Sequence, residues 1–367
     1  MDLTLTSEQS LLRDSAAKFI AAAGPKVARK FRGCDPAFDP ARLRQAGELG
    51  WLGMLVPASS DGLGLGLTEL ALVMEQAGRG LVSEPLCLAA IAAAALSATE
   101  SARAPHPMLE RAMSGAALIV PALQENGHGD DPLAPRTKAT GEGGRPRLNG
   151  TKTFVCAEGA EGFLVSAISP EGPVLCLVLR GAPGCSLTPT QTVDGRDIAA
   201  LHLTDTPAEL VPPHPASQNA VEALHNLALM AVSAELLGVM AQAQDVTLDY
   251  LRIRKQFGKV IGSFQALQHQ ATNIYIRVEA TRSLVYQVAA NNGPYRIDPA
   301  LAIAVKAKAS EEALTVTQAC IQLHGAIGFT DEHDIGLYLK RAMLLASLFG
   351  NAAEQRRRYV AAARLLD

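Results

Sequence analysis

The sequence predicts a mainly helical protein with a small β domain in the middle of the chain. Apolar residues recur at helical spacing from Thr6 to about Leu123, and again from Gln218 to the C-terminal end. Between about Leu118 and Leu210, short alternating or β-branched runs are separated by glycine, proline and aspartate turns. We therefore expect three domains, over residues 1–123, 124–213 and 214–367.

The composition is that of a globular protein with a large core. The chain has 367 residues, 48% of them hydrophobic, and 33 Lys and Arg against 36 Asp and Glu. A near-neutral charge gives no broad positive field, so nucleic acid is not an expected partner. The six cysteines form no C-x-x-C pair, and no metal site is expected. The N-terminus lacks a basic region followed by an apolar stretch, which favours a reducing cytoplasm and no membrane partner.

Helices with a packed face are expected in the N-terminal domain. One opens at Ser7 and another at Thr68, and the proline and three glycines of Val56–Gly66 place a loop between them. The most apolar run, Leu86–Leu96, is about half of the ~20 residues that a membrane span needs, so it predicts a buried helix.

The middle domain is expected to be a small β domain. Asn126–Arg147 is polar and rich in glycine, which indicates a long exposed connection, and four prolines from Pro207 to Pro215 indicate a stiff linker out of the domain. The predicted strands include Thr153–Cys156, Gly162–Val165, Val174–Leu179 and Ala199–Leu203.

The C-terminal domain is expected to be a bundle of long helices. Few residues there break a helix, over Gln218–Asn291 and from Pro299 onward. Apolar residues cover most of the circumference of the first helix, which is typical of a helix that buries more than one face. Contacts between subunits are therefore expected.

Two turns in this bundle allow two interpretations each. Gly258 and Ser263 fit a glycine that ends one helix and a serine cap that opens the next. Alternatively, the planar fork of Arg254 binds a pyrophosphate while Phe257 and Gln265 line a nucleotide.

The second turn, Gln322–Phe329, fits either a plain helix stop at Gly325 or a close approach of backbone amides to a phosphate. Neither turn alone indicates a particular function, but the wording of the two motifs and their order along the chain together do.

Over its whole length the chain resembles the acyl-CoA dehydrogenase family. The resemblance implies an N-terminal helical domain, a small β-barrel or sandwich and a C-terminal four-helix bundle, with FAD held between the last two in an oligomer. The matching segments are Leu49–Gly53, Gly62–Gly66, Leu148–Lys152, Arg254–Gly258 and Gln322–Gly325.

Members of this family remove two hydrogens from an acyl-CoA thioester. A carboxylate takes the α-proton, hydrogen bonds to the thioester carbonyl stabilise the enolate, and the flavin takes the β-hydride. The resemblance implies that Arg254, Phe257 and Gln265 contact FAD, and that Gln322 and Gly325 reach the flavin nucleotide of the neighbouring subunit.

The chain departs from the family where the base should stand. Phe349 occupies the usual place of the glutamate, and Ala228 occupies the place used by a minority of members. A phenyl ring cannot accept a proton, so no catalytic residue is assigned.

The residues expected beside the flavin ring depart as well. Leu123–Asp130 replaces a Thr-Glu-Pro-type motif. Phe154 keeps an aromatic ring at the flavin, whereas Cys156 is a poorer hydrogen-bond partner than the hydroxyl residue it replaces.

Three other residues are candidates for the catalytic base. Glu235 lies seven residues after Ala228 and returns to nearly the same helical face, but an ion pair with a bundle arginine such as Arg277 or Arg282 is the favoured interpretation. His324 and His269 fit structural roles better than a catalytic one.

The leading hypothesis is an FAD-dependent acyl-CoA dehydrogenase that works as one subunit of a heteromeric enzyme, of the type known from fatty acid or steroid side-chain degradation. Its expected partners are an acyl-CoA, a related subunit and an electron-transfer flavoprotein as acceptor. The alternatives are a self-sufficient homo-oligomer with a relocated base, and a scaffold subunit without redox activity.

Overall fold

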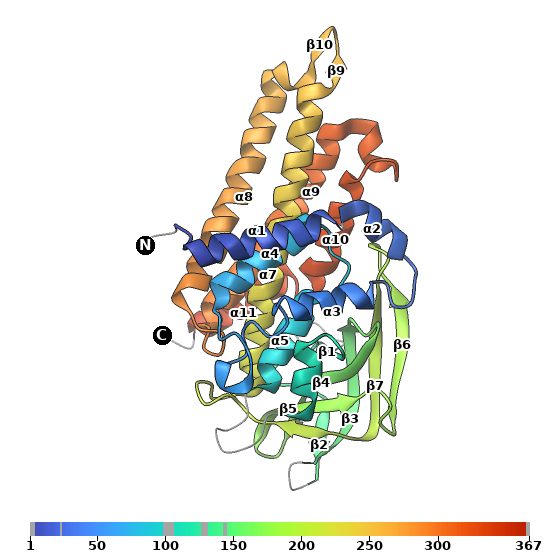
Figure 1. Cartoon of the computed structure of the whole chain (residues 1–367), viewed down its shortest axis with the longest axis vertical. Helices are drawn as coiled ribbons and strands as arrows, with labels where there is room; N and C mark the ends of the chain where they lie inside the picture. Colours follow the sequence, from blue (N-terminus) through green and yellow to red (C-terminus); the bar gives the residue numbers. More distant parts are fainter. Residues whose placement is uncertain (1–3, 23, 98–105, 126–130, 142–144, 365–367) are drawn as a thin grey trace.

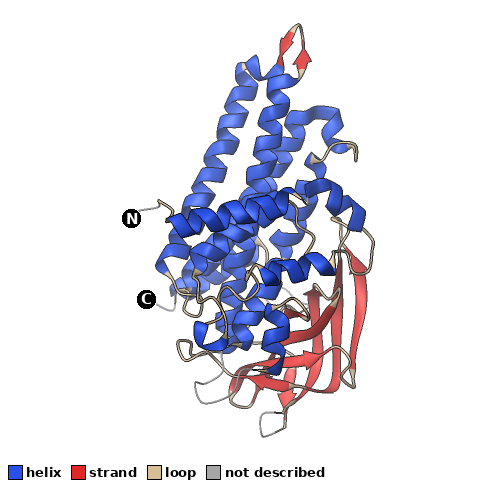
Figure 2. Cartoon of the chain, in the orientation of Figure 1, coloured by secondary structure: helices blue, strands red, loops and turns tan. Residues whose placement is uncertain are grey.

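The computed structural model describes residues 4–22, 24–97, 106–125, 131–141 and 145–364 (Figure 1). A helical N-terminal part, a sheet and a helical C-terminal part follow one another along the chain, which confirms the predicted fold class (Figure 2). The sheet lies at one end of the molecule, and the long helices extend away from it toward the other end.

The N-terminal helices begin where capping residues place them. The backbone N–H of Gln9 donates to the Thr6 hydroxyl at 3.2 Å, and the Gln9 side chain accepts from the Thr6 N–H at 3.0 Å, so the predicted start at Ser7 is confirmed. The predicted loop Val56–Gly66 contains one short 3₁₀ helix, Ala58–Ser60. The helices are α1 (Ser7–Ala21), α2 (Gly24–Phe31), α3 (Pro40–Glu48), α4 (Leu67–Arg79), α5 (Leu86–Leu96) and α6 (Pro107–Met113).

Helix α5 is the apolar run that the sequence marked as a buried helix. All of its residues except Ala95 are buried in the core. The interpretation of this segment as a core helix is therefore confirmed.

One eight-stranded mixed sheet forms the middle of the chain, in the order β6-β7-β3-β2-β4-β5-β8, with β1 pairing in parallel with β4. The four runs predicted as strands fall in β3, β4, β5 and β7, whereas the other four strands were not predicted. The strands are β1 (Leu118–Ala122), β2 (Lys138–Thr140), β3 (Arg147–Val155), β4 (Ala160–Ser169), β5 (Gly172–Leu179), β6 (Cys185–Gln191), β7 (Asp197–Pro207) and β8 (Glu209–Val211).

Two predicted connections contain strands. The expected exposed connection Asn126–Arg147 is wrong over β2, where Ala139 is buried and the strand pairs with both β3 and β4. The expected proline linker is shorter than predicted, because Pro207 ends β7 and β8 pairs with β5.

The C-terminal bundle consists of α7, α8, α9 and α10, with α11 packed on α9. Helix α7 is long and apolar enough to cross a membrane, but it is almost wholly buried inside the protein, as the core helix of a globular bundle would be. The helices are α7 (Ala220–Ile253), α8 (Gln265–Asn291), α9 (Pro299–His324), α10 (Ile335–Ser347) and α11 (Ala352–Arg364).

Helices α4 and α7 cross at two glycines. A Cβ at Gly238 would lie 1.9 Å from the backbone oxygen of Glu75, and a Cβ at Gly78 would lie 2.0 Å from the backbone oxygen of Glu235. Only residues without a side chain allow the two backbones to approach this closely. The crossing therefore fixes the N-terminal helices against the bundle.

Replacing Gly238 with alanine should lower the free energy of unfolding by about 1–3 kcal/mol, because the new methyl group would meet backbone that cannot move aside. Urea denaturation measures the change. The matched control is Gly336→Ala in α10, where the new Cβ would lie 3.7 Å from its nearest neighbour. Equal stability of the two variants would contradict the close crossing.

Candidate functional site

The candidate residues Arg254 and Phe257 lie at the free end of the bundle. Arg254 ends α7 in an extended conformation, and a two-stranded hairpin, β9 (Lys255–Gln256) and β10 (Lys259–Val260), follows it. Phe257, at the turn of the hairpin, is 89% exposed and has a φ of 53°. The Arg254 side chain is exposed and has no hydrogen-bond or ion-pair partner among the residues described.

The capping interpretation of this turn is wrong. Gly258 has a φ of 77° and lies at the turn of the hairpin, between β9 and β10, rather than at the end of α7. Ser263 belongs to a short 3₁₀ helix, and Phe264 precedes α8. Gln265, the first residue of α8, is exposed, so all three candidates of this segment face outward.

Gln322 and Gly325 lie at the end of α9, and both are exposed. Gly325 has a φ of 67°, and a Cβ built there would meet no atom within 4 Å. The helix therefore ends at Gly325, and the open space beside the glycine leaves its backbone accessible to a ligand.

An aromatic stack joins these two segments. The rings of Tyr250, in the last turn of α7, and His324, in the last turn of α9, stack with their centroids 4.5 Å apart. The N–H of Arg254 donates to the carbonyl oxygen of Tyr250 at 2.9 Å. The two motifs that are far apart in the sequence therefore lie at the same end of the bundle.

Phe154 and Cys156 lie at the end of β3, in the sheet. Phe154 is 41% exposed with a φ of 54°, where the pairing of β3 with β7 shifts register. Burial raises the pKa of the Cys156 thiol to about 11, so the group is a neutral S–H at pH 7. The hairpin of Arg254 lies at the end of the bundle away from the sheet, so within one chain the two sets of candidates are separate (Figure 1).

Phe349 lies in the loop between α10 and α11, and the backbone groups of this residue are occupied by side chains. The N–H of Phe349 donates to Oε1 of Gln124 at 2.7 Å, and its carbonyl oxygen accepts from Nε2 of Gln355 at 2.7 Å. Gln124 also donates to the carbonyl oxygen of Ser347 at 3.2 Å. Phe349 is 5% exposed, so an apolar ring fills the position where the resemblance places a carboxylate.

The other position at which the resemblance places a base in some members is also apolar. Ala228 is fully buried inside α7. The loop that carries Gln124 is anchored by Glu125, which accepts from the buried Lys152 ammonium at 2.6 Å. Asn126–Asp130, the rest of the predicted flavin-ring loop, lies outside the described residues.

Hydrogen bonds from the Lys306 side chain anchor the loop that contains Phe349. Its fully buried ammonium donates to the carbonyl oxygens of Ala346 and Gly350 at 3.0 Å each, and to the Ser310 hydroxyl at 2.7 Å. Burial lowers the pKa of Lys306 to about 7, an effect that the charge of Glu354 only partly offsets. A lysine in a helical periodic run gives no sequence signal for this role.

Because of Lys306, the stability of the protein should rise between pH 7 and about pH 8.5, above which buried cysteines such as Cys156 and Cys320 oppose the rise, since burial raises the pKa of their thiols. Below a pH of about 7 the folded chain keeps a proton on the buried Lys306, whereas the unfolded chain keeps it up to a pH of about 10.4. Between these values the unfolded state binds more protons, so raising the pH favours the folded state. Urea denaturation at several pH values between 7 and about 8.5 measures the rise.

Lys306→Met should remove most of this rise, whereas Lys308→Met should keep it, because Lys308 is partly exposed and paired with Glu312. An unchanged pH dependence in Lys306→Met would show that other groups cause the rise.

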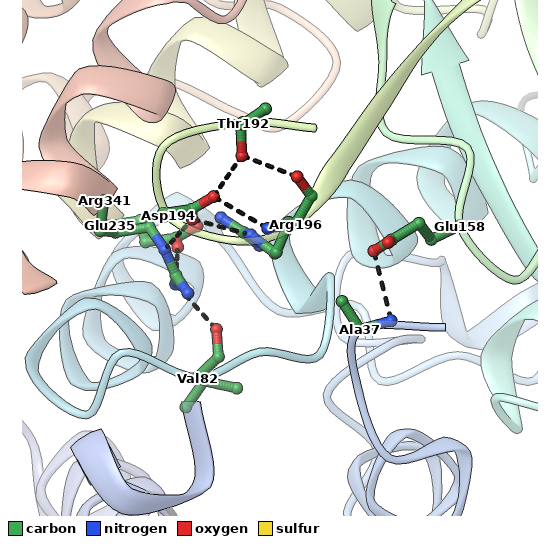
Figure 3. A network of polar contacts seen from close by, with 8 residues as sticks. All are labelled: Ala37, Val82, Glu158, Thr192, Asp194, Arg196, Glu235 and Arg341. Carbon is green, nitrogen blue, oxygen red and sulfur yellow. Dashed lines mark hydrogen bonds and ion pairs between the residues drawn. The ribbon is translucent and has the colours of Figure 1, made fainter. Parts of the chain in front are cut away.

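Glu235 belongs to a buried network of four charged side chains (Figure 3). Nε of Arg341 donates to Asp194 at 3.0 Å, and Nη1 of Arg341 donates to the Val82 carbonyl oxygen at 2.8 Å and lies 3.5 Å from Glu235. Nε of Arg196 donates to the same Asp194 oxygen at 3.1 Å. The network joins the β6–β7 turn to α7, α10 and the segment after α4.

The predicted pairing of Glu235 with an arginine of the bundle is confirmed, but the two arginines named for it are wrong. Arg277 pairs with Glu312 at 2.6 Å, and Arg282 pairs with Glu75 and Glu279. Arg341 lies 106 residues after Glu235, and only the fold brings the two together. A carboxylate paired with a buried arginine is a structural group, which removes the main argument for a relocated base.

Asp194 is the acidic centre of the network. Burial alone would raise the pKa of this carboxyl, but the neighbouring Arg196 and Arg341 outweigh burial and hold the pKa well below its usual value. Arg196 also acts on the Cys156 thiol, and its charge opposes the effect of burial there. The network therefore lies next to the end of β3 that carries the sheet-side candidates.

Comparison with known proteins identifies the family of the chain. The model of the acyl-CoA dehydrogenase N-terminal domain matches residues 6–106, and that of the C-terminal domain matches residues 219–364. The chain is 28% identical to acyl-CoA dehydrogenase IpdE2 of Mycolicibacterium smegmatis over 356 residues, which cover 96% of this chain and 98% of that protein.

Two solved structures are similar over nearly the whole chain. A steroid acyl-CoA dehydrogenase, Tcur3481–Tcur3483, solved as a variant, superposes with a TM-score of 0.89 at 31% identity, covering 98% of each chain. The ChsE4–ChsE5 complex from Mycobacterium tuberculosis superposes with a TM-score of 0.87 at 27% identity, also covering 98% of each chain.

The fold and these matches define a flavin-dependent oxidoreductase that acts on acyl-CoA thioesters. The chain belongs to the acyl-CoA dehydrogenase family, whose cofactor is FAD.

The bundle end and the sheet side of the chain differ in how well their residues fit FAD. At the bundle end, Arg254 has no partner among the described residues and Gly325 leaves open space, so both suit the nucleotide part of the cofactor. On the sheet side, Phe154 offers an exposed ring, but the Gln124 amide is already bonded to the Phe349 loop. The bundle end fits the group well, and the sheet side fits it only in part.

Proposed function

We propose that this chain is one subunit of a heteromeric FAD-dependent acyl-CoA dehydrogenase and that it lacks the usual glutamate base. The observation that carries the proposal is the Phe349 loop. At the position of the base an apolar side chain is buried, and the N–H and carbonyl of the same residue are held by Gln124 and Gln355. The exposed bundle-end residues are free to serve a flavin bound mainly by another subunit.

The similar structures support a paired enzyme. ChsE4–ChsE5 is a complex of two named chains, and Tcur3481–Tcur3483 is likewise named for two. By analogy, the related partner chain of this protein supplies the carboxylate that removes the α-proton. Bound FAD would supply the hydride acceptor for the β-carbon, and an electron-transfer flavoprotein is the acceptor that we propose for the electrons.

This chain contributes residues that bind the cofactor rather than the group that accepts the proton. Arg254 binds the pyrophosphate through its planar fork, with Phe257 and Gln265 beside the nucleotide and Gln322 and Gly325 at the other side. Phe154 and Cys156 border the flavin ring on the sheet side. The enzyme works in the cytoplasm on an acyl-CoA from fatty acid or steroid side-chain degradation.

The test is to purify the chain alone and together with related acyl-CoA dehydrogenase chains from the same genome, each co-expressed with it in turn. We expect the isolated chain to show no turnover of acyl-CoAs even with added FAD, and the joint assembly to be active with fewer flavins than chains. Flavin absorbance, mass in solution and reduction of an electron-accepting dye give the three readouts. A homo-oligomer with one FAD per chain and robust turnover would overturn the proposal.

The two alternatives predict different results in the same experiment. A self-sufficient enzyme with Glu235 as its base would lose activity in Glu235→Gln without loss of stability, although the pairing with Arg341 argues against this role. A scaffold subunit would give a colourless assembly that takes up no FAD.

A further inference from the structure

The residue Gln124 links the sheet side of the candidate site to the loop that contains Phe349. Its backbone carbonyl oxygen accepts from the N–H of Thr153 at 2.8 Å, directly before Phe154. Its side chain reaches the bundle, where Oε1 accepts from the Phe349 N–H at 2.7 Å and Nε2 donates to the Ser347 carbonyl oxygen at 3.2 Å. Gln124 therefore extends from the strand that carries Phe154 to the loop that contains Phe349.

A reacting acyl group would have to lie in the same place. The base takes the α-proton and the flavin takes the hydride from the neighbouring β-carbon, so both carbons must lie between the base and the flavin ring. On this chain Phe349 marks the position of the base and Phe154 marks the side of the ring. The thioester carbonyl is bonded to the α-carbon, so its oxygen would lie beside the backbone N–H of Phe349, a donor that could stabilise an enolate.

This N–H is engaged by the side chain of Gln124 instead. An amide oxygen is a better hydrogen-bond acceptor than the oxygen of a thioester. The amide is also tethered to the same chain, which gives it a higher effective concentration than a free ligand has. A thioester would have to displace the Gln124 amide and leave its polar groups without their partners, which costs affinity.

Other buried groups fix the orientation of this N–H. The carbonyl oxygen of Phe349 accepts from Gln355, and the Lys306 ammonium donates to two further carbonyl oxygens of the same loop. Phe349 is 5% exposed and has a φ of 57°, in the left-handed region. The described contacts therefore hold the N–H toward Gln124.

We infer that Gln124 excludes the acyl thioester from the cleft of this chain, because its side-chain carbonyl occupies the place of the thioester carbonyl. This inference rests on the proposed function and deepens it. The missing carboxylate prevents proton removal in this cleft, whereas Gln124 prevents an acyl-CoA from binding there without reacting. The acyl group binds only in the cleft of the partner chain.

The test compares Gln124→Ala with the wild type, using the full chain purified alone and two probes, octanoyl-CoA and free CoA. Free CoA lacks the thioester, so the ratio of the two dissociation constants reports the acyl end of the ligand. We expect a ratio near one in the wild type. In Gln124→Ala, octanoyl-CoA should bind about three- to tenfold more tightly than CoA, as expected for one hydrogen bond gained. Isothermal titration calorimetry gives the constants.

A second readout is the carbonyl stretching frequency of octanoyl-CoA with an isotope label at the thioester carbonyl. A hydrogen bond from the Phe349 N–H lowers this frequency, so it should be lower with Gln124→Ala than with the wild type. A purely structural role of Gln124 would not produce the shift. Gln124→Ser, whose side chain is also too short to reach Phe349, should give the same two results.

The matched control is Gln9→Ala. The Gln9 side chain also accepts from a backbone N–H, that of Thr6 at 3.0 Å, and its Nε2 donates to Glu69 at 2.7 Å. Gln9 lies in α1, which packs on α4, so its replacement should leave the ratio near one.

The outcomes distinguish the inference from the proposed function. If the wild-type chain already binds octanoyl-CoA more tightly than CoA without turning it over, this inference fails while the proposed function stands. If Gln124→Ala and Gln124→Ser lose stability in urea but gain neither the preference nor the frequency shift, Gln124 is a structural link and the inference fails as well. Robust turnover of octanoyl-CoA by the wild-type chain alone would overturn both.

Discussion

Arg341→Met should lower the free energy of unfolding by about 3–5 kcal/mol, because it leaves the buried Glu235 carboxylate without a compensating charge. Asp194 keeps Arg196, but Glu235 loses the only ion-pair partner that it has among the described residues. Methionine is similar in length, so a cavity contributes little. Urea denaturation at one fixed protein concentration measures the loss, since the stability of an oligomer depends on concentration.

The control for this variant is Arg356→Met. Arg356 pairs with Glu311, and both side chains are about half exposed, so the change should stay within about 0.5 kcal/mol. The double variant Arg341→Met with Glu235→Gln should recover part of the lost stability, because it removes the uncompensated charge. If Arg341→Met is as stable as Arg356→Met, the network does not hold the domains together.

Arg254→Ala should release most of the flavin while leaving the fold intact. The guanidinium has no partner among the described residues, so its loss removes no internal contact. Charge-assisted hydrogen bonds to a pyrophosphate contribute about 1.5–3 kcal/mol, which corresponds to a roughly 10- to 100-fold weaker affinity for FAD. The measurement is FAD stoichiometry and affinity in whichever assembly holds the cofactor.

Arg252→Ala is the matched control for Arg254. Arg252 lies two residues earlier and is also exposed, but its guanidinium is paired with Asp249 at 2.8 Å. It therefore carries the same charge as Arg254, whereas its hydrogen-bond donors are already engaged within the chain. We expect full flavin content in this variant. Retention of stoichiometric FAD by Arg254→Ala would show that the motif match misplaces the pyrophosphate.

Local patterns predicted much of the fold because they report burial directly. The apolar run Leu86–Leu96 coincides with α5, and the helix expected to open at Ser7 begins there. Strands β2 and β8 were missed because each has only three residues, too few for an alternating pattern to show. The hairpin after α7 was missed because Gly258 at a positive φ fits a helix end and a hairpin turn equally well.

The candidate site was predictable only as a list of residues. The sequence motifs assigned Arg254 and Gln322 to the same cofactor site of the family. The two segments are joined in the structure by the stack of Tyr250 on His324, which are 74 positions apart in the sequence. The pairing of Glu235 with Arg341, and the hold of Gln124 on Phe349, span still longer separations. Contacts of this kind depend on how the domains pack, which no local spacing encodes.

The close crossing of α4 and α7 also bears on how the chain is made. Gly78 leaves the ribosome about 160 residues before Gly238, the residue against which its helix packs. During that interval the face of α4 that carries Gly78 has no partner, and the whole sheet is synthesised in between. The N-terminal helices therefore complete their packing only late in translation, and the nascent chain needs protection from aggregation until α7 has emerged.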